Sequence, residues 1–150
     1  MTTTLQGRNA SSDEGSILPL LAGFVALALA LLIVVAAASS LYLERKRLYT
    51  AADAAALAAA QSFPLDAVEV GADGTVTPVL TDELVAGAAR DYVSALPAEL
   101  EALVLEEAES PDGVSARVTL SSVWRPPLAS PLLPDGVRIS VTTVARTALR

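Results

Sequence analysis

The chain contains no cysteine and no histidine, and its only lysine is Lys46. The lack of cysteine excludes disulfides and thiolate chemistry. Without either residue type, zinc sites of the usual kinds and Ser–His or Cys–His nucleophile pairs are excluded as well. A Ser–Lys pair would have to use Lys46, which follows directly on a long apolar run. We therefore expect a protein that is not an enzyme and that holds no cofactor or metal.

Basic residues are scarce in the segment from Asp66 to Asp112. Twelve acids and a single base, Arg90, lie between Asp66 and Asp112, and the net charge is −7. This balance repels nucleic acid, so a nucleic-acid partner is not expected. Bases return at Arg117, Arg125, Arg138, Arg146 and Arg150. An acidic half followed by a basic half fits either head-to-tail packing of like subunits or an ordinary solvated surface.

Glycine and proline are absent between Phe24 and Phe63. Nothing local therefore interrupts a helix from Ser16 to Phe63, which would be roughly 70 Å long. Its first part, Ile17–Leu43, carries no charged side chain and exceeds the ~20 residues that span a bilayer. A cleaved secretory signal ending at the small residues 36–38 is the alternative. A retained membrane anchor is favoured, because the apolar run is longer than a signal's apolar region.

Small residues recur within this apolar run. Ala22, Ala26 and Ala30 are spaced four apart, and Gly23 lies beside the first of them. Such spacing lets helix backbones approach closely in lipid, although an alanine-rich composition alone would also produce it. These four residues are candidates for helix packing.

A charged collar, residues 44–47, follows the apolar run. Glu44 and Arg47 are spaced for an (i, i+3) ion pair. Three bases follow the span where one, Arg8, precedes it. The positive-inside rule would then place the C-terminal side in the cytoplasm.

The helix continues beyond the collar as an alanine-rich block. Asp53 has no basic residue at the three- and four-residue positions of its own helix. It is either a solvated acid or a charge whose partner lies on a neighbouring subunit or on the chain's own globular domain. Poly-alanine favours helix formation and close helix-on-helix packing.

The remaining residues, 64–150, predict a small α+β domain with an antiparallel sheet and one helix. Thr81 is a candidate N-cap for a helix that runs to about Leu96 and stops at Pro97. The segments expected to be extended are 68–80 as a hairpin or a loose β-turn excursion, 100–109 as a strand or a helix–strand transition, 114–124, and 137–146. The inward side chains are predicted to be Val114, Ala116, Val118 and Leu120 in one strand, and Val137, Ile139 and Val141 in the last.

Two further features of the sequence bear on ligand binding. The acids Glu99, Glu101, Glu106, Glu107, Glu109 and Asp112 could suggest calcium, but no Asp-x-Asp-x-Asp-Gly loop accompanies them, and solvated strand and turn positions fit better. Trp124 is expected to anchor a sheet edge rather than to bind a ligand.

Residues 15–63 resemble the N-terminal segment of the Tad (tight adherence) proteins, the TadE/TadG-like components of bacterial Flp pilus assembly. The resemblance rests on Gly15-Ser16, the apolar span, and Arg47-Leu48-Tyr49-Thr50 followed by Ala51-Ala52-Asp53-Ala54-Ala55-Ala56-Leu57-Ala58-Ala59-Ala60. It implies a pilin-like or pseudopilin-like membrane subunit of a pilus or secretion apparatus, with Leu48, Asp53 and Leu57 in helix packing and assembly.

The resemblance also implies partners and an orientation. The expected partners are other pilin-like subunits or Tad assembly proteins, including further copies of this chain. The expected division is a disordered leader (1–15), a transmembrane helix (16–43), a helical extension (44–63) and an extracytoplasmic domain (64–150). Processing between Gly15 and Ser16 would place Leu20 fifth, where prepilin-type processing favours Glu. Both a processed chain and a permanent anchor therefore stay open. The alternative function is a membrane-anchored adaptor whose acidic domain faces the cytoplasm and recruits assembly factors.

Overall fold

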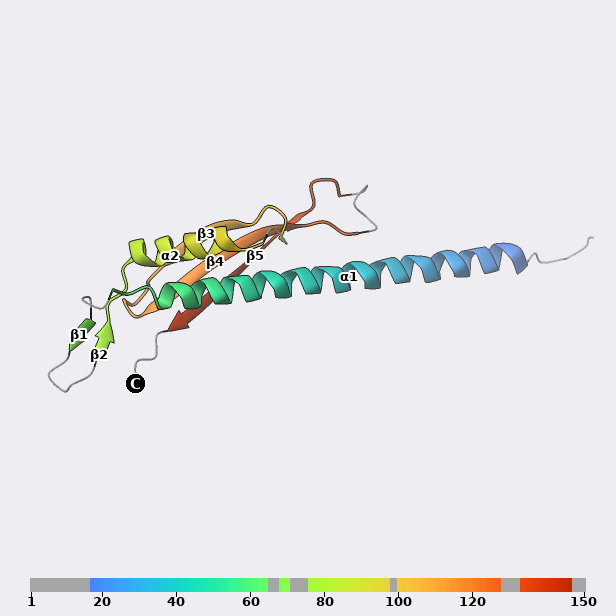
Figure 1. The fold of residues 1–150 in the computed structure, drawn as a ribbon. Coiled ribbons are helices and arrows are strands. Elements are labelled where there is room, and N and C mark those ends of the chain that lie inside the picture. Colours follow the sequence, from blue (N-terminus) through green and yellow to red (C-terminus); the bar gives the residue numbers. More distant parts are fainter. Residues whose placement is uncertain (1–16, 65–67, 71–75, 98–99, 128–132, 147–150) are drawn as a thin grey trace, which may run out of the picture. The chain divides into compact units, whose positions relative to one another are not determined.

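The computed structural model describes residues 17–64, 68–70, 76–97, 100–127 and 133–146. The chain divides into two compact units, residues 1–34 and 35–150. The elements in chain order are helix α1, strands β1 and β2, helix α2, and strands β3, β4 and β5 (Figure 1). The predicted α+β class, with a long apolar helix ahead of a small antiparallel sheet and a short helix, is confirmed.

Helix α1 covers Ile17–Ala60 without interruption. It forms because its interior holds leucine and alanine in abundance and, after Gly23, neither glycine nor proline. The Gln61 N–H bonds to the Leu57 carbonyl at 3.2 Å and to the Ala58 carbonyl at 3.3 Å, which closes the last turn. The helix thus ends three residues before Phe63, the last position that its sequence allows.

Three antiparallel strands form the main sheet in the order β3–β4–β5. These strands are β3 (Val104–Glu109), β4 (Ser115–Trp124) and β5 (Val137–Arg146). The turn between β3 and β4 was predicted, and Asp112 shapes it by accepting the backbone N–H groups of Val114 (3.1 Å) and Ser115 (2.7 Å). The register of β3 against β4 shifts between Leu105 and Glu107, as at a β-bulge.

Helix α2 (Asp82–Ala95) begins and ends as predicted. Thr81 is its N-cap, and its hydroxyl accepts the Leu84 N–H at 3.4 Å. The Asp82 carboxylate accepts the Ser110 N–H at 2.7 Å, which ties the start of α2 to the end of β3. Ahead of α2, β1 (Val68–Val70) and β2 (Val76–Pro78) pair antiparallel, so the predicted hairpin is confirmed.

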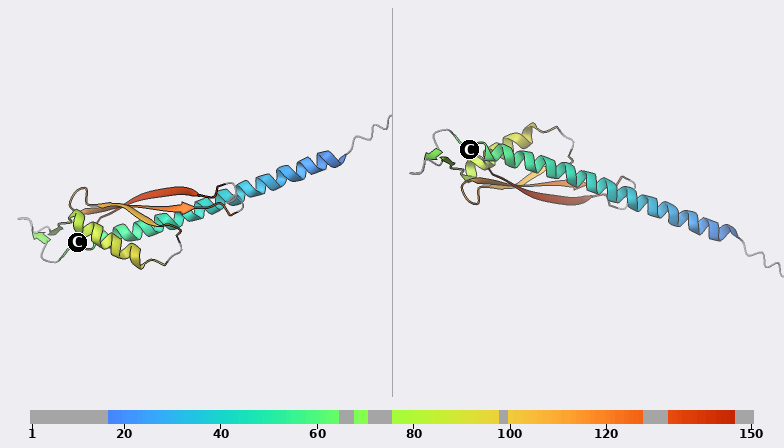
Figure 2. Two further views of the ribbon diagram at one scale, coloured as in Figure 1. Left: turned by 90° about the horizontal axis from the view of Figure 1, so that it is seen from above. Right: turned by 90° about the horizontal axis from the view of Figure 1, so that it is seen from below.

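The hydrophobic core lies between the two helices and one face of the sheet. Figure 2 shows α2 and the later turns of α1 on the same side of the three-stranded sheet. The fully buried apolar side chains of this core are Leu48, Ala52, Ala55, Ala56, Ala59 and Ala60 of α1, Val85 and Ala89 of α2, and Ala116, Val118 and Leu120 of β4. The Ala-rich block, expected from the sequence to be an extension of the anchor, is therefore one wall of this core.

The inner face of β5 differs in part from the prediction. Val141 is buried and Ile139 packs against the core, but Val137 at the strand's start is 42% exposed. Val137 pairs with Trp124 at the last register position of β4, beyond the reach of the core. Val114, predicted to be the first inward residue of β4, lies before the strand and is half-buried.

Candidate assembly surfaces

The apolar part of α1 is exposed along all its described residues in the first unit, Ile17–Val34. This stretch is long and apolar enough to cross a membrane, and it fits a single-pass anchor. Ala22, Gly23, Ala26 and Ala30 lie on it, and a Cβ added to Gly23 would meet no atom within 4 Å. Their role in helix packing stays a prediction. Gly15 and Ser16, the predicted processing position, lie outside the described residues.

Beyond the collar, α1 turns one face to its own core. Leu48 is fully buried there, and it is the largest of the α1 side chains in the core. The alanines that follow it are small, so the helix can lie close to the sheet. Leu48 was predicted to take part in helix packing and assembly. Its side chain packs inside the core of its own chain.

The face of α1 next to the buried one carries what we call the outer stripe, Tyr49, Asp53 and Leu57. These residues are four apart and so share one side of the helix. Tyr49 is 53% and Leu57 51% exposed. Asp53 is exposed, and its carboxylate forms no hydrogen bond or ion pair with any other residue that the structure describes. An aromatic, a charge and a leucine are therefore open to a partner.

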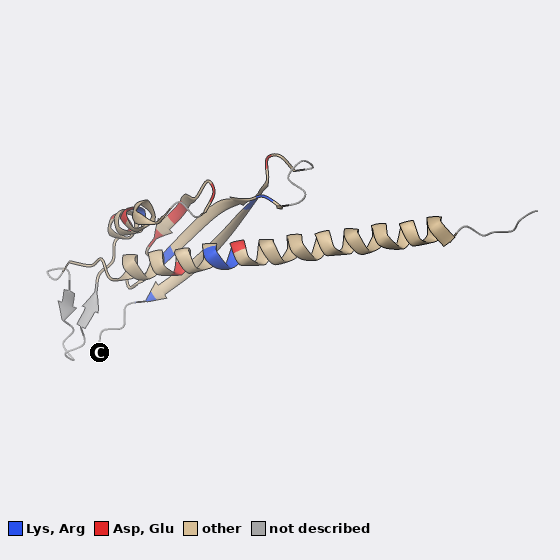
Figure 3. Cartoon of the chain, turned by 45° about the vertical axis from the view of Figure 1, so that its right-hand side comes forward, with Lys and Arg blue, Asp and Glu red and all other residues tan. Residues whose placement is uncertain are grey.

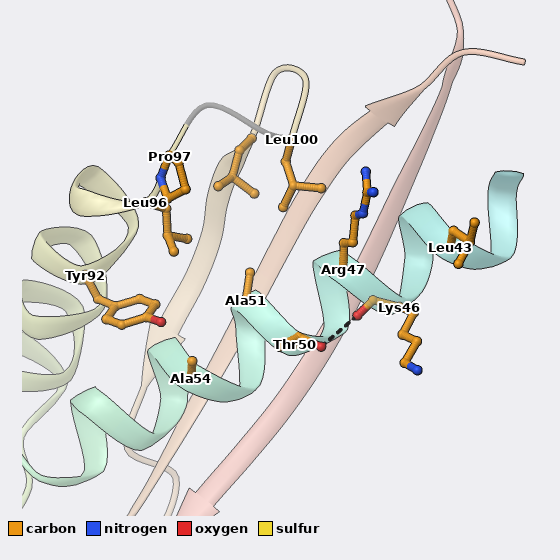
Figure 4. A pocket seen from close by; sticks show the side chains of 11 residues that line it. Leu43, Lys46, Arg47, Thr50, Ala51, Ala54, Tyr92, Leu96, Pro97 and Leu100 are labelled. Carbon is orange, nitrogen blue, oxygen red and sulfur yellow. Dashed lines mark hydrogen bonds between the residues drawn. The ribbon is translucent and has the colours of Figure 1, made fainter. Parts of the chain in front are cut away.

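Beside the outer stripe lies a groove of about 350 Å³. Its walls include Arg47, Ala51 and Ala54 on α1 and Tyr92, Leu96 and Leu100 opposite them. In Figure 4, Arg47 extends to the side on which Leu96 and Leu100 lie, whereas Lys46 points away from them. Arg47 is exposed and, within the described part of the chain, has no hydrogen-bond or ion-pair partner. The groove is lined mostly by apolar residues, and its two cationic lining residues, Lys46 and Arg47, have no ion-pair partner among the described residues.

The charged collar is a compact band on α1 (Figure 3). The predicted ion pair between Glu44 and Arg47 is wrong, because the ion pairs among the described residues all lie elsewhere. An (i, i+3) pair on a helix surface contributes only about 0.2–0.5 kcal/mol, so hydration of both groups competes with it.

Acids and bases of the two oppositely charged halves meet on the sheet. Arg117 contacts Glu109 at 2.7 Å across β3 and β4, and Arg138 contacts Glu106 at 3.5 Å. Arg125 forms an ion pair with Glu101. Three of the late bases thus have their acids within the same chain, which leaves less charge for the head-to-tail packing considered from the sequence.

A hydrogen bond joins the sheet to α1 over 84 residues of sequence. Trp124, the last residue of β4, is 9% exposed, and its indole N–H donates to the Ser40 hydroxyl at 3.2 Å. The sequence marked Trp124 as an anchor but gave no signal for its partner. Ser40 has no local feature that distinguishes it from Ser39.

Metal binding finds no support in the described residues. No group of three or more His, Cys, Asp or Glu side chains there could hold an ion. Glu106 instead accepts the Ser121 hydroxyl, which also accepts Arg138 at 2.8 Å. Of the acids considered for calcium, Glu99 lies outside the described residues.

The fold and these surfaces define a chain with a helix fit for a single-pass anchor and a small α+β unit built on the same helix. Residues 15–62 match the Tad family model, described as "Putative Flp pilus-assembly TadE/G-like". The match covers about a third of the chain and confirms the resemblance seen in the sequence. The matched segment is thus similar to a family described for Flp pilus assembly. No curated protein and no solved structure matches the chain.

Proposed function

We propose that the chain is a pilin-like, single-pass subunit of an Flp-type pilus or secretion apparatus, with its α+β unit outside the cytoplasmic membrane. One observation carries this proposal. The same unbroken helix is apolar and exposed from Ile17 to Val34 and supplies one wall of a folded core from Leu48 onward. Such a helix gives one chain both a membrane anchor and a folded head, by which we mean the unit of residues 35–150. A subunit handed from a membrane to an assembly requires both.

The extent of the family match supports the same proposal. It covers residues 15–62, nearly the whole of α1, and stops before α2 and the sheet. The shared feature is therefore the helix and not the head. We infer from this division that the helix makes the contacts shared across the family, and that the head makes contacts specific to this chain.

A second candidate rests on the collar. Arg45, Lys46 and Arg47 are exposed directly after the apolar run, and the positive-inside rule then favours a head in the cytoplasm. In that orientation the chain would be an anchored adaptor that recruits assembly factors. The side of the membrane on which the head lies separates the two candidates.

Deletion and complementation in the bacterium that encodes the chain test the proposed function. Deletion is expected to abolish Flp pili counted by electron microscopy, and the full chain in trans is expected to restore them. Leu29→Arg places a charge in the apolar run, costs about 2.5–3.5 kcal/mol of insertion free energy, and should not restore them. Gln61→Arg, the same new charge on the exposed end of α1, is the matched control and should restore them. Normal pili after deletion would refute the proposal.

A further inference from the structure

We infer that the outer stripe of one copy docks into the groove of a second copy, with Asp53 of the first facing Arg47 of the second. This interface rests on the proposed function, because a single-pass anchor orients neighbouring copies in parallel. The occupant of the groove is thus a second copy of this chain.

Charge complementarity identifies the occupant. Asp53 and Arg47 are both exposed on α1, and neither has a hydrogen-bond or ion-pair partner among the described residues. The groove supplies apolar walls, and the stripe supplies Leu57 and Tyr49, each about half exposed. Leu57 packed on the small alanines of the groove would bury apolar surface. The ion pair beside it would fix the register of the two helices.

The spacing sets the stagger between the copies. Bringing Asp53 level with Arg47 of a parallel neighbour needs a shift of six residues, or about 9 Å along the helix. The same shift brings Leu57 level with Ala51 and Tyr49 level with Leu43, both of which line the groove. All three residues of the stripe therefore meet the groove in one register.

The stripe and the groove occupy different faces of α1, so one copy can use both. Contacts of this heterologous kind either close into rings or continue as open helical assemblies. A chain that serves a pilus is expected to use the open form.

Cysteine cross-linking tests the interface, because the chain has no cysteine of its own. Two differently tagged full-length copies, Leu57→Cys and Ala51→Cys, are co-expressed in the deletion strain and oxidised in membranes. We expect the mixed 57–51 dimer to exceed the 57–57 and 51–51 dimers about tenfold. A second pair, Tyr49→Cys with Leu43→Cys, tests the same register in case Ala51→Cys disturbs the half-buried helix face. Dominant like-with-like dimers, or no mixed dimer from either pair, would overturn the inference.

Charge reversal shows whether the ion pair holds the register. Asp53→Arg should lower the mixed dimer about tenfold, and Asp53→Arg combined with Arg47→Asp in both copies should restore it. Arg90→Glu reverses an exposed charge on α2 and should leave the yield unchanged. Pilus counts on the same strains separate the two proposals. Pili that need the chain but form without the 57–51 contact refute the interface alone, whereas pili that do not need the chain refute the function.

Discussion

The indole N–H of Trp124 donates a hydrogen bond to the hydroxyl of Ser40 and so joins the end of β4 to helix α1. Ser40 lies three residues before Leu43, where the uncharged run ends. The end of β4 is thereby joined to the part of α1 that precedes the charged collar. Together with Leu48, this contact extends the packing of sheet against helix over more than two helical turns.

Removal of the Ser40 hydroxyl should weaken the head. Ser40→Ala is expected to lower the free energy of unfolding by about 1 kcal/mol, because the indole N–H of the buried Trp124 loses its acceptor. The control is Ser39→Ala, since the Ser39 hydroxyl bonds only to the Val35 carbonyl of its own helix at 2.8 Å. Denaturant unfolding of the full chain in micelles, followed by the fluorescence of Trp124, measures both. Equal losses in the two variants would argue against a contribution from the Trp124 contact.

Two glycines should respond oppositely to alanine. Gly136 has φ +67°, and a Cβ there would lie 2.7 Å from the Trp124 carbonyl oxygen, so Gly136→Ala should destabilise the fold by at least about 1 kcal/mol. Gly87 lies inside α2 with nothing within 4 Å of such a Cβ. Gly87→Ala should stabilise the fold by up to about 1 kcal/mol. Thermal unfolding by circular dichroism checks the signs, and a stable Gly136→Ala would show that the β5 turn can relax.

Thr143 is buried in the sheet's inner face, and its hydroxyl has no hydrogen-bond partner in the described structure. Thr143→Val keeps the shape and removes the unsatisfied group, so stability should stay the same or rise by up to about 1 kcal/mol. Thr119→Val is the comparison, because the Thr119 hydroxyl is hydrogen-bonded to Thr142 at 2.9 Å. It should lose a few tenths of a kcal/mol. A marked loss at Thr143 in unfolding experiments would reveal a partner for its hydroxyl.

Asp112 should give the fold an acid-sensitive turn. Hydrogen bonds from the Val114 backbone, then from the Ser115 side chain, hold the pKa of Asp112 below its ordinary value. A lowered folded-state pKa stabilises the fold above the unfolded-state pKa of about 3.9, and this contribution is lost as the pH falls through the folded-state pKa. Asp112→Asn should therefore flatten stability against pH below pH ~4 in denaturant titrations. If Asp112→Asn loses stability with falling pH as steeply as the unchanged chain does, the acid sensitivity of the fold comes from other carboxylates.

Local signals predicted most of the fold. The Thr81 cap, the stop at Pro97 and the inward side chains Ala116, Val118 and Leu120 of β4 each depend on neighbours in the sequence, and each was confirmed. The face on which the alanine block packs could not be predicted, because an almost uniform run of alanine gives every face of a helix the same character. Leu48 is the only large side chain on the inner face of this block, and a single residue cannot show the helical periodicity by which a buried face is recognised.

Contacts between residues far apart in the chain also could not be predicted from the sequence. Trp124 with Ser40, and Arg125 with Glu101, join residues far apart in the chain, and nothing in either local sequence names the partner. The groove arises in the same way, because its two walls come from α1 and from the segment around Leu96 and Leu100. Part of the outer stripe was named from the sequence, because the family resemblance implied that Asp53 and Leu57 take part in assembly. Tyr49 was not named in that role.

The side of the membrane that holds the C-terminus tests the central proposal most directly. Two reporters, one active only outside the cytoplasm and one only inside it, are fused in turn after Arg150 of the full chain and compared at equal protein level. A pilin-like subunit predicts activity of the external reporter and none of the internal one. The reverse pattern would contradict an extracytoplasmic head and favour the anchored cytoplasmic adaptor.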